Sequence, residues 1–164
     1  MEYYATQEEF ASLYPNASAD AYSRFAWDAQ KYIDNATGTV DGVKKLRIAY
    51  PENEEDAEAV VRCMCAVINA LDEVDAVKTS ATAAGSYVNT ANGYVSAGIR
   101  SISAGGESIT YGIDAGAETD TLRAAKSGAA LKQYVYGIIE SYLRGVADAN
   151  GVNLLYGGRY PARG

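Results

Sequence analysis

Apolar side chains recur every three or four residues, the spacing of one face of an α-helix, in three stretches of the chain. From about residue 18 to 35 these positions are Tyr22, Phe25, Ala26, Ala29, Tyr32 and Ile33, with Trp27 off the stripe. From about 53 to 77 they are Ala57, Val60, Val61, Met64, Ile68 and Leu71. From about 119 to 150 they are Leu122, Ala125, Ala129, Leu131, Val135, Ile138, Ile139, Tyr142 and Val146. The pattern predicts a mainly α fold, a small bundle of three to four helices.

Short polar motifs predict where the helices begin. Thr6 and Glu9 have the spacing of a capping box, which predicts a short helix to about residue 14. Ser18 is the expected N-cap of the next helix. Asn53 is the expected N-cap of the one after, whose first turn is acidic. The segment 43–50 between them can be helical or extended.

The predicted last helix contains Gly128 and Gly137, which would let it bend or pack closely on a neighbour. Asn150 and Gly151 are its expected end, because this pair tolerates the left-handed conformation. The tail that follows, residues 151–164, carries the apolar side chains Leu154, Leu155, Tyr156 and Tyr160. We expect an extended segment that lies on an apolar surface of this domain or of a neighbour.

The segment 79–117 differs from the rest, because it is rich in Gly, Ser, Thr and Ala and has no helical period. Its two β-type runs, 94–104 and 107–111, flank Gly105 and Gly106, as in a hairpin with a tight turn. A two-stranded hairpin is barely stable alone in water, so this one is expected to contact the helices or another subunit.

Composition predicts one domain in 164 residues, with a modest core and no membrane-spanning segment. The N-terminus lacks the pattern of a signal peptide, so we expect a cytoplasmic protein. Cys63 and Cys65 are the only cysteines. Two positions apart on a helix they point in different directions, which favours two buried thiols over a metal or redox pair.

Catalytic chemistry has little support in the sequence. The chain has no histidine, which excludes Ser-His-Asp and Cys-His sites and the common zinc sites. Glycine-rich nucleotide-binding motifs are missing as well. The densest carboxylate cluster is in the first turn predicted after Asn53, where helix-end electrostatics accounts for it better than a metal does. We expect no enzyme activity, cofactor or metal.

Charge is distributed unevenly along the chain. Residues 1–77 carry 15 acidic and 6 basic side chains, whereas residues 78–164 carry 6 and 8. This distribution suits contacts between unlike surfaces and argues against tight DNA binding. Asp72, Glu73 and Asp75 lie near the predicted end of the second long helix. They form either a solvated face or an acidic surface that faces a basic neighbour or a channel.

The order of these parts resembles a known family. Tyr-Ala-Thr-x-Glu-Glu-Phe at 4–10 precedes a helix, Val-Asp-Gly-Val-x-Lys-Leu at 40–46 and an acid-capped second helix. A Gly/Ser hairpin insertion follows, and then Tyr-Leu-x-Gly-Val-x-Asp-x-Asn-Gly-Val-Asn-Leu-Leu-Tyr at 142–156. This arrangement resembles the head-tail connector (adaptor or head-completion) proteins of long-tailed bacteriophages and prophages, over nearly the whole chain.

The resemblance implies a structural virion component, assembled in the bacterial host cytoplasm as a ring of about twelve copies beneath the portal. DNA would pass through the ring without sequence-specific binding, and the partners would be the portal protein and a tail-side completion protein, with no membrane contact. The residues implied for portal docking are Asn153, Leu154, Leu155, Tyr156 and Tyr160. The residues implied for subunit or tail contacts in the hairpin are Ile99, Ile102, Ile109 and Tyr111.

An alternative function stays open at the level of sequence. A small cytosolic helical binding or regulatory protein could use the same apolar tail to engage one partner. A carboxylate-dependent enzyme built on Glu54, Glu55 and Glu58 is a third and weaker hypothesis.

Overall fold

The computed structural model describes residues 3–87, 101–104, 107–110 and 119–157. These residues form six helices: α1 (Gln7–Leu13), α2 (Ala21–Thr37), α3 (Lys45–Ile48), α4 (Glu54–Tyr87), α5 (Asp120–Lys126) and α6 (Gly128–Leu143). They also form two antiparallel two-stranded sheets, β1 (Thr39–Val40) with β2 (Val43–Lys44), and β3 (Ser101–Ala104) with β4 (Glu107–Thr110). The predicted mainly α fold with a β-hairpin is confirmed.

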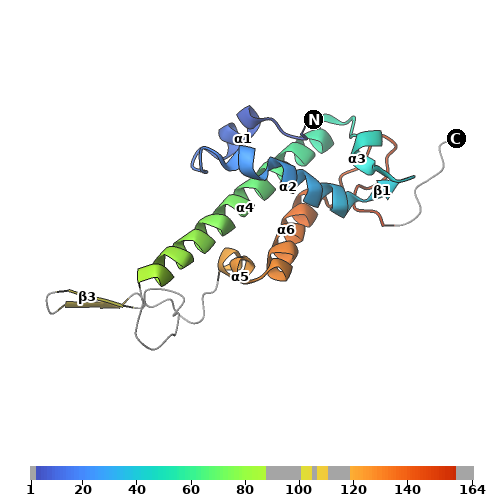
Figure 1. Cartoon of the computed structure of the whole chain (residues 1–164). Coiled ribbons are helices and arrows are strands. Elements are labelled where there is room, and N and C mark those ends of the chain that lie inside the picture. The colour runs from blue at the N-terminus through green and yellow to red at the C-terminus, as the bar shows by residue number, and fades with distance from the viewer. Residues whose placement is uncertain (1–2, 88–100, 105–106, 111–118, 158–164) are drawn as a thin grey trace.

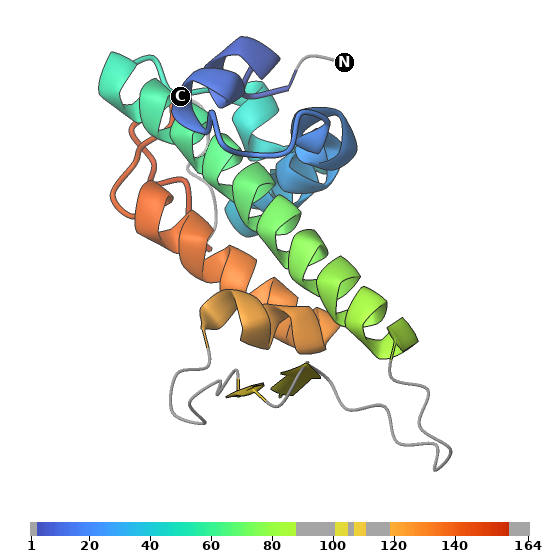
Figure 2. The ribbon, with the colours of Figure 1, turned by 90° about the vertical axis from the view of Figure 1, so that its left-hand side faces the viewer.

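Helix α4 is the axis of the molecule (Figure 1). Helices α2 and α6 pack on it, α1 lies beside its first half, and α5 lies beside its second half (Figure 2). The small β1–β2 sheet and α3 lie at the end of α2, on the side away from α1 (Figure 1). The β3–β4 hairpin lies beyond the last turn of α4.

A single apolar cluster joins α1, α2, α3, α4, α6 and the tail. Six consecutive residues of α4, positions 63–68, are all buried, so this part of the helix is covered on every side. A helix that is apolar all round is typical of the centre of a bundle. The largest fully buried side chains of this segment are Met64 and Ile68, and those that the other elements contribute are Ile33, Leu46, Ile139, Leu143 and Leu154.

The predicted helix starts are confirmed at α1 and α4 but not at α2. Thr6 and Glu9 form the capping box of α1, and the Asn53 carboxamide accepts from the Glu55 N–H at 3.1 Å. Ser18 does not cap α2, because the helix begins after Asp20. The Ser18 N–H instead donates to the Asp72 carboxylate at 3.0 Å, so this loop is fixed to α4.

Helix α4 is ten residues longer than its apolar stripe predicted, because it ends at Tyr87 and not near Val77. Three of the ten extra residues, 78–87, are alanine, which favours helix, and the segment has no stripe of large apolar side chains. Periodicity therefore identified only the packed part of the helix.

The single helix predicted from 119 to 150 is wrong, because the stretch folds as α5 and α6. Ser127 between them has an extended backbone, with φ −155° and ψ 155°. Its hydroxyl caps α6 by accepting from the Ala130 N–H at 3.1 Å. Helix α6 ends at Leu143, before Gly145 with φ +88°, and not at Asn150. Side-chain capping at Ser127 is the local cause of the break.

The segment 43–50, which could be helical or extended, is both. Residues 43–44 form strand β2, and the next four residues form α3. A turn with positive φ at Asp41 (51°) and Gly42 (80°) joins β1 to β2.

Candidate partner-binding surfaces

The tail that was predicted to dock on a partner folds back onto its own domain. The Leu154 N–H donates to the Val146 carbonyl at 2.8 Å, and the Asp148 N–H donates to the Val152 carbonyl at 2.9 Å. Leu154 is fully buried in the apolar core. The Leu154 side chain is therefore already covered within the same chain and offers no exposed surface for the predicted contact with a portal.

A buried lysine holds this part of the tail. Lys45 of α3 is only 2% exposed, and its ammonium group donates to the carbonyls of Asn153 at 2.5 Å and Leu154 at 3.4 Å. Burial lowers the pKa of Lys45, and the nearby carboxylate of Asp148 opposes that shift. Asn153 also has an internal role, because its side-chain oxygen accepts from the Leu155 N–H at 2.8 Å.

The remaining predicted docking residues differ in exposure. Leu155 is half-buried against the core, whereas Tyr156 is 53% exposed. Tyr160 lies outside the described residues. Of the five predicted positions, Tyr156 is the one that the structure places on the surface with a free apolar side chain.

The predicted contact hairpin is present over a shorter length. Ile102 of β3 and Ile109 of β4 are directly paired, whereas Ile99 and Tyr111 lie outside the described residues. Within the described strands, β3 and β4 pair with each other, and each leaves its second edge unpaired.

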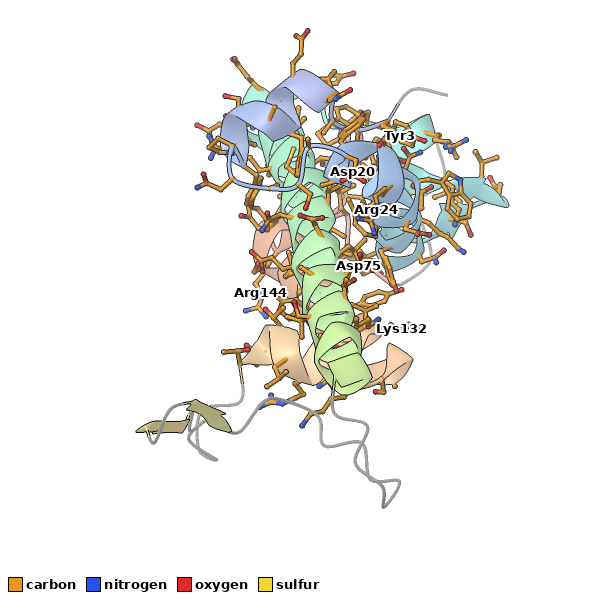
Figure 3. The ribbon with its side chains drawn as sticks, turned by 60° about the vertical axis from the view of Figure 1, so that its left-hand side comes forward. Tyr3, Asp20, Arg24, Asp75, Lys132 and Arg144 are labelled. Carbon is orange, nitrogen blue, oxygen red and sulfur yellow. The ribbon has the colours of Figure 1, made fainter. Side chains whose placement is uncertain are left out.

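The three carboxylates expected near a helix end lie in the middle of α4, and each has an internal partner. Asp72 is 7% exposed and accepts from the Ser18 N–H, so it is no part of a solvated acidic face. Asp75 forms an ion pair with Arg24 of α2 at 2.5 Å (Figure 3), and Glu73 accepts from the Asn69 amide at 2.8 Å. Asp72 and Asp75 therefore join α4 to the Ser18 loop and to α2, whereas the partner of Glu73 lies on α4 itself.

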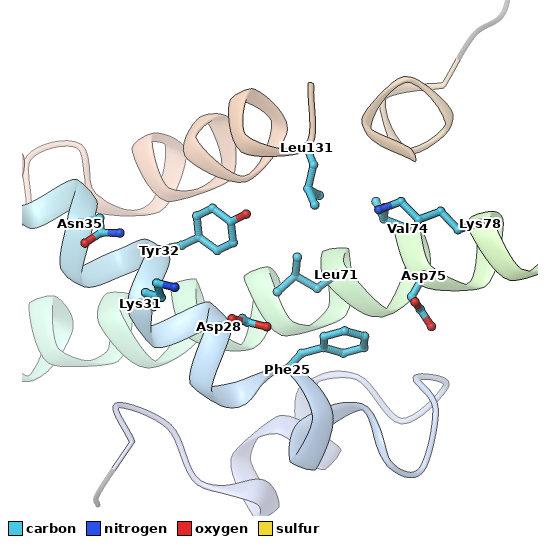
Figure 4. Close-up of a pocket in the computed structure, with 10 residues that line it drawn as sticks. All are labelled: Phe25, Asp28, Lys31, Tyr32, Asn35, Leu71, Val74, Asp75, Lys78 and Leu131. Atoms are coloured by element: carbon cyan, nitrogen blue, oxygen red, sulfur yellow. The ribbon is translucent and has the colours of Figure 1, made fainter. Parts of the chain in front are cut away.

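An open groove of about 320 Å³ separates α2, α4 and α6 (Figure 4). Tyr32, Leu71 and Leu131, one from each helix, point into it. Acidic and basic side chains alternate around its rim, so the groove has no dominant charge; they are Asp28, Lys31, Asp75 and Lys78.

A second groove lies between α1 and the first half of α4. It has a volume of about 400 Å³ and an apolar floor that contains Leu13, 39% exposed, and Val61. We name it the acidic groove, because its other lining residues are Glu8, Glu9, Ser12, Glu58 and Arg62.

A basic corner lies where α2 meets β2 and α3. Trp27, 55% exposed, is its apolar centre, and Lys31 lies with its ammonium group 4.8 Å from the indole ring centroid. Lys44 and Arg47 line the same small depression, together with Gln30 and Asp34. We name this surface the tryptophan corner. One sign of this surface is visible in the sequence, because Trp27 lies off the apolar stripe of its helix.

The two cysteines are buried and free. Burial raises the pKa of Cys63 from 9.0 to about 12 and that of Cys65 to about 11. Both thiols therefore stay protonated near neutral pH, which makes them poor nucleophiles and poor metal ligands.

These pKa shifts predict a loss of stability in alkali. Below pH 9 the thiols are protonated in both the folded and the unfolded chain, but between pH 9 and 12 the unfolded chain releases their protons first. The free energy of unfolding, measured by urea titration, should fall as pH rises through this range. Buried tyrosines also titrate in this pH range, so the wild type has to be compared with a variant that lacks both thiols. In the variant with Cys63→Ala and Cys65→Ala, the free energy of unfolding should fall less steeply with pH. Equal slopes would contradict the prediction.

Two carboxylates near the start of α4 already have partners within the chain. Glu58 pairs with Arg62 at 2.6 Å, and Asp56 accepts from the Ala147 N–H at 3.4 Å. Among the described residues no group of three or more acidic or cysteine side chains is arranged to hold a metal ion. None of the described helices combines the length and apolar composition needed to cross a bilayer.

Comparison of the chain with protein-family models, with curated proteins and with solved structures finds no match.

Proposed function

We propose that this protein is a structural subunit of a ring that joins the portal of a phage head to the tail and lets DNA pass. The order of motifs along the chain is the basis of the proposal. One structural observation carries it furthest: β3 and β4 form a hairpin beyond the end of α4, with open edges. Such a hairpin gains stability by adding to a strand or surface of another subunit.

The charge distribution agrees with this proposal. Exposed carboxylates gather around α1 and the start of α4, whereas Arg47 of α3 and Arg123 and Lys126 of α5 are exposed cations. Unlike surfaces on one subunit are what a head-to-tail contact requires, and such contacts close into rings when the rotation permits.

The test is the mass of the protein in solution, alone and with the portal protein encoded in the same phage or prophage genome. We expect light scattering over a concentration series to show a closed ring or a complex with the portal, and electron microscopy to show an annular particle. Ile109→Pro, which removes a strand N–H outside the apolar core, should weaken that assembly. A protein of 17.4 kDa that stays monomeric at every concentration and ignores the portal would contradict the proposal.

The alternative function, a regulatory protein that binds a partner through its apolar tail, loses its main support in the placement of Leu154. A tail whose central leucine is fully buried in its own domain has only Tyr156 left as an exposed apolar contact among the described residues.

A further inference from the structure

We infer that the joint between neighbouring subunits forms when the tryptophan corner of one copy enters the acidic groove of the next. This inference rests on the self-association in the proposed function and identifies the two surfaces that make the contact. The second copy is chosen as the occupant because both complementary surfaces are present on one chain.

The acidic groove is suited to an aromatic side chain with cations around it. Its floor contains Leu13 and Val61, and the exposure of Leu13 leaves apolar surface in contact with water. Three carboxylates and one guanidinium line it, so its net charge is negative. The guanidinium of Arg62 is already paired with Glu58 at 2.6 Å.

The tryptophan corner has the opposite properties. Three cations, Lys31, Lys44 and Arg47, line the same depression as an exposed indole. The one carboxylate beside them, Asp34, is 5% exposed and accepts from the Tyr4 hydroxyl at 2.6 Å, so it contributes little to the outer surface. Tryptophan and arginine are the residues most often found at the energetic centre of protein interfaces.

The position of the two surfaces makes the contact head to tail. The groove is lined by residues of α1 and α4 and the corner by residues of α2, β2 and α3, so the two surfaces share no residue. Helix α1 and the end of the molecule with α3 and β1 lie on either side of α2 (Figure 1). One copy can therefore use its corner and its groove at the same time, with a different neighbour on each side. Contacts between unlike surfaces, with a different neighbour at each, are the contacts from which closed rings are built.

Charge reversal on each side tests the joint. The groove variant carries Glu8→Lys and Glu58→Lys, and the corner variant carries Lys31→Glu and Lys44→Glu. Lys44 is half-buried and the other three residues are exposed. Each variant alone should self-associate about tenfold more weakly than the wild type or worse, because like charges then face each other. An equal mixture of the two should regain assembly, because every joint in an alternating ring pairs opposite charges. Regained assembly also shows that both variants are folded.

The chain supplies a direct reporter and a matched control. Trp27 is the only tryptophan. Its fluorescence should shift to shorter wavelength when the wild type assembles, and stay unshifted in the corner variant alone. The control, Lys132→Glu, reverses an exposed charge outside both surfaces and should assemble as the wild type does.

The outcomes separate this inference from the proposed function. Wild-type assembly with no fluorescence shift, or with both reversed variants assembling normally, would place the joint elsewhere and leave the ring proposal standing. Variants that stay monomeric after mixing would likewise overturn the inference. A wild type that never self-associates and ignores the portal would overturn both.

Discussion

Replacing Leu154 by alanine should lower the free energy of unfolding by about 2 to 5 kcal/mol, the range for removing a fully buried leucine side chain. Leu154 is completely buried, and its N–H also joins the tail to the end of α6 through the Val146 carbonyl. The loss combines the lost burial of the side chain with the cavity left between the tail and α6. Urea or thermal unfolding followed by circular dichroism measures it.

Tyr156→Ala is the matched control, because Tyr156 is two positions further along the tail and 53% exposed. Its stability should change by less than about 0.5 kcal/mol, as for most surface substitutions. Equal losses in the two variants would show that Leu154 has no special place in the core. The same structure predicts that deleting residues 152–164 destabilises the helical fold, contrary to the expectation of a separable docking tail.

Replacing Lys45 by alanine should cost about 3 kcal/mol or more, the effect of removing one partner from a buried charged network. The substitution leaves the Asn153 and Leu154 carbonyls without their donor, and it leaves the buried Asp148 without the nearby cation. Loss of the anchor should also free the tail, so amide hydrogen exchange at residues 152–156 should increase in the same variant.

Lys44→Ala is the control for this prediction, since Lys44 is the adjacent lysine and forms one exposed hydrogen bond, with the Asn35 side chain at 3.1 Å. A change of less than about 0.5 kcal/mol is expected there. If Lys45→Ala changed the free energy of unfolding as little as Lys44→Ala, Lys45 would not be the residue that holds the tail.

Helix caps and apolar stripes could be predicted from the sequence, because they depend on residues that are close together in the chain. The capping box at Thr6 and the N-cap at Asn53 each involve residues no more than three positions apart, and the structure contains both. The stripe of α2 and the packed half of α4 follow from the 3.6-residue period. The same period wrongly predicted one continuous helix across Ser127. The apolar pattern continues through this position, but the serine caps a new helix there.

The candidate surfaces were less predictable, because exposure depends on what packs elsewhere. Leu154 and Tyr156 look alike in the sequence, yet one is fully buried and the other is exposed. Leu13 was unmarked in the sequence, and its exposure in the acidic groove follows from the way α1 lies on α4. In the sequence Asp72 looks like part of an acidic face. In the structure it accepts a hydrogen bond from the N–H of Ser18, which is 54 positions earlier in the chain.

The helical class, the hairpin and the caps at Thr6 and Asn53 could be predicted from residue type and short spacing, and the lack of histidine is a matter of composition. Packing between distant parts of the chain accounts for the rest. It buries Leu154 in the core, gives three carboxylates their internal contacts, and places the acidic groove and the tryptophan corner on different elements. The physical reason is the same in each case. The contact between Lys45 and Asn153 joins residues 108 positions apart, and packing alone selects such a pair.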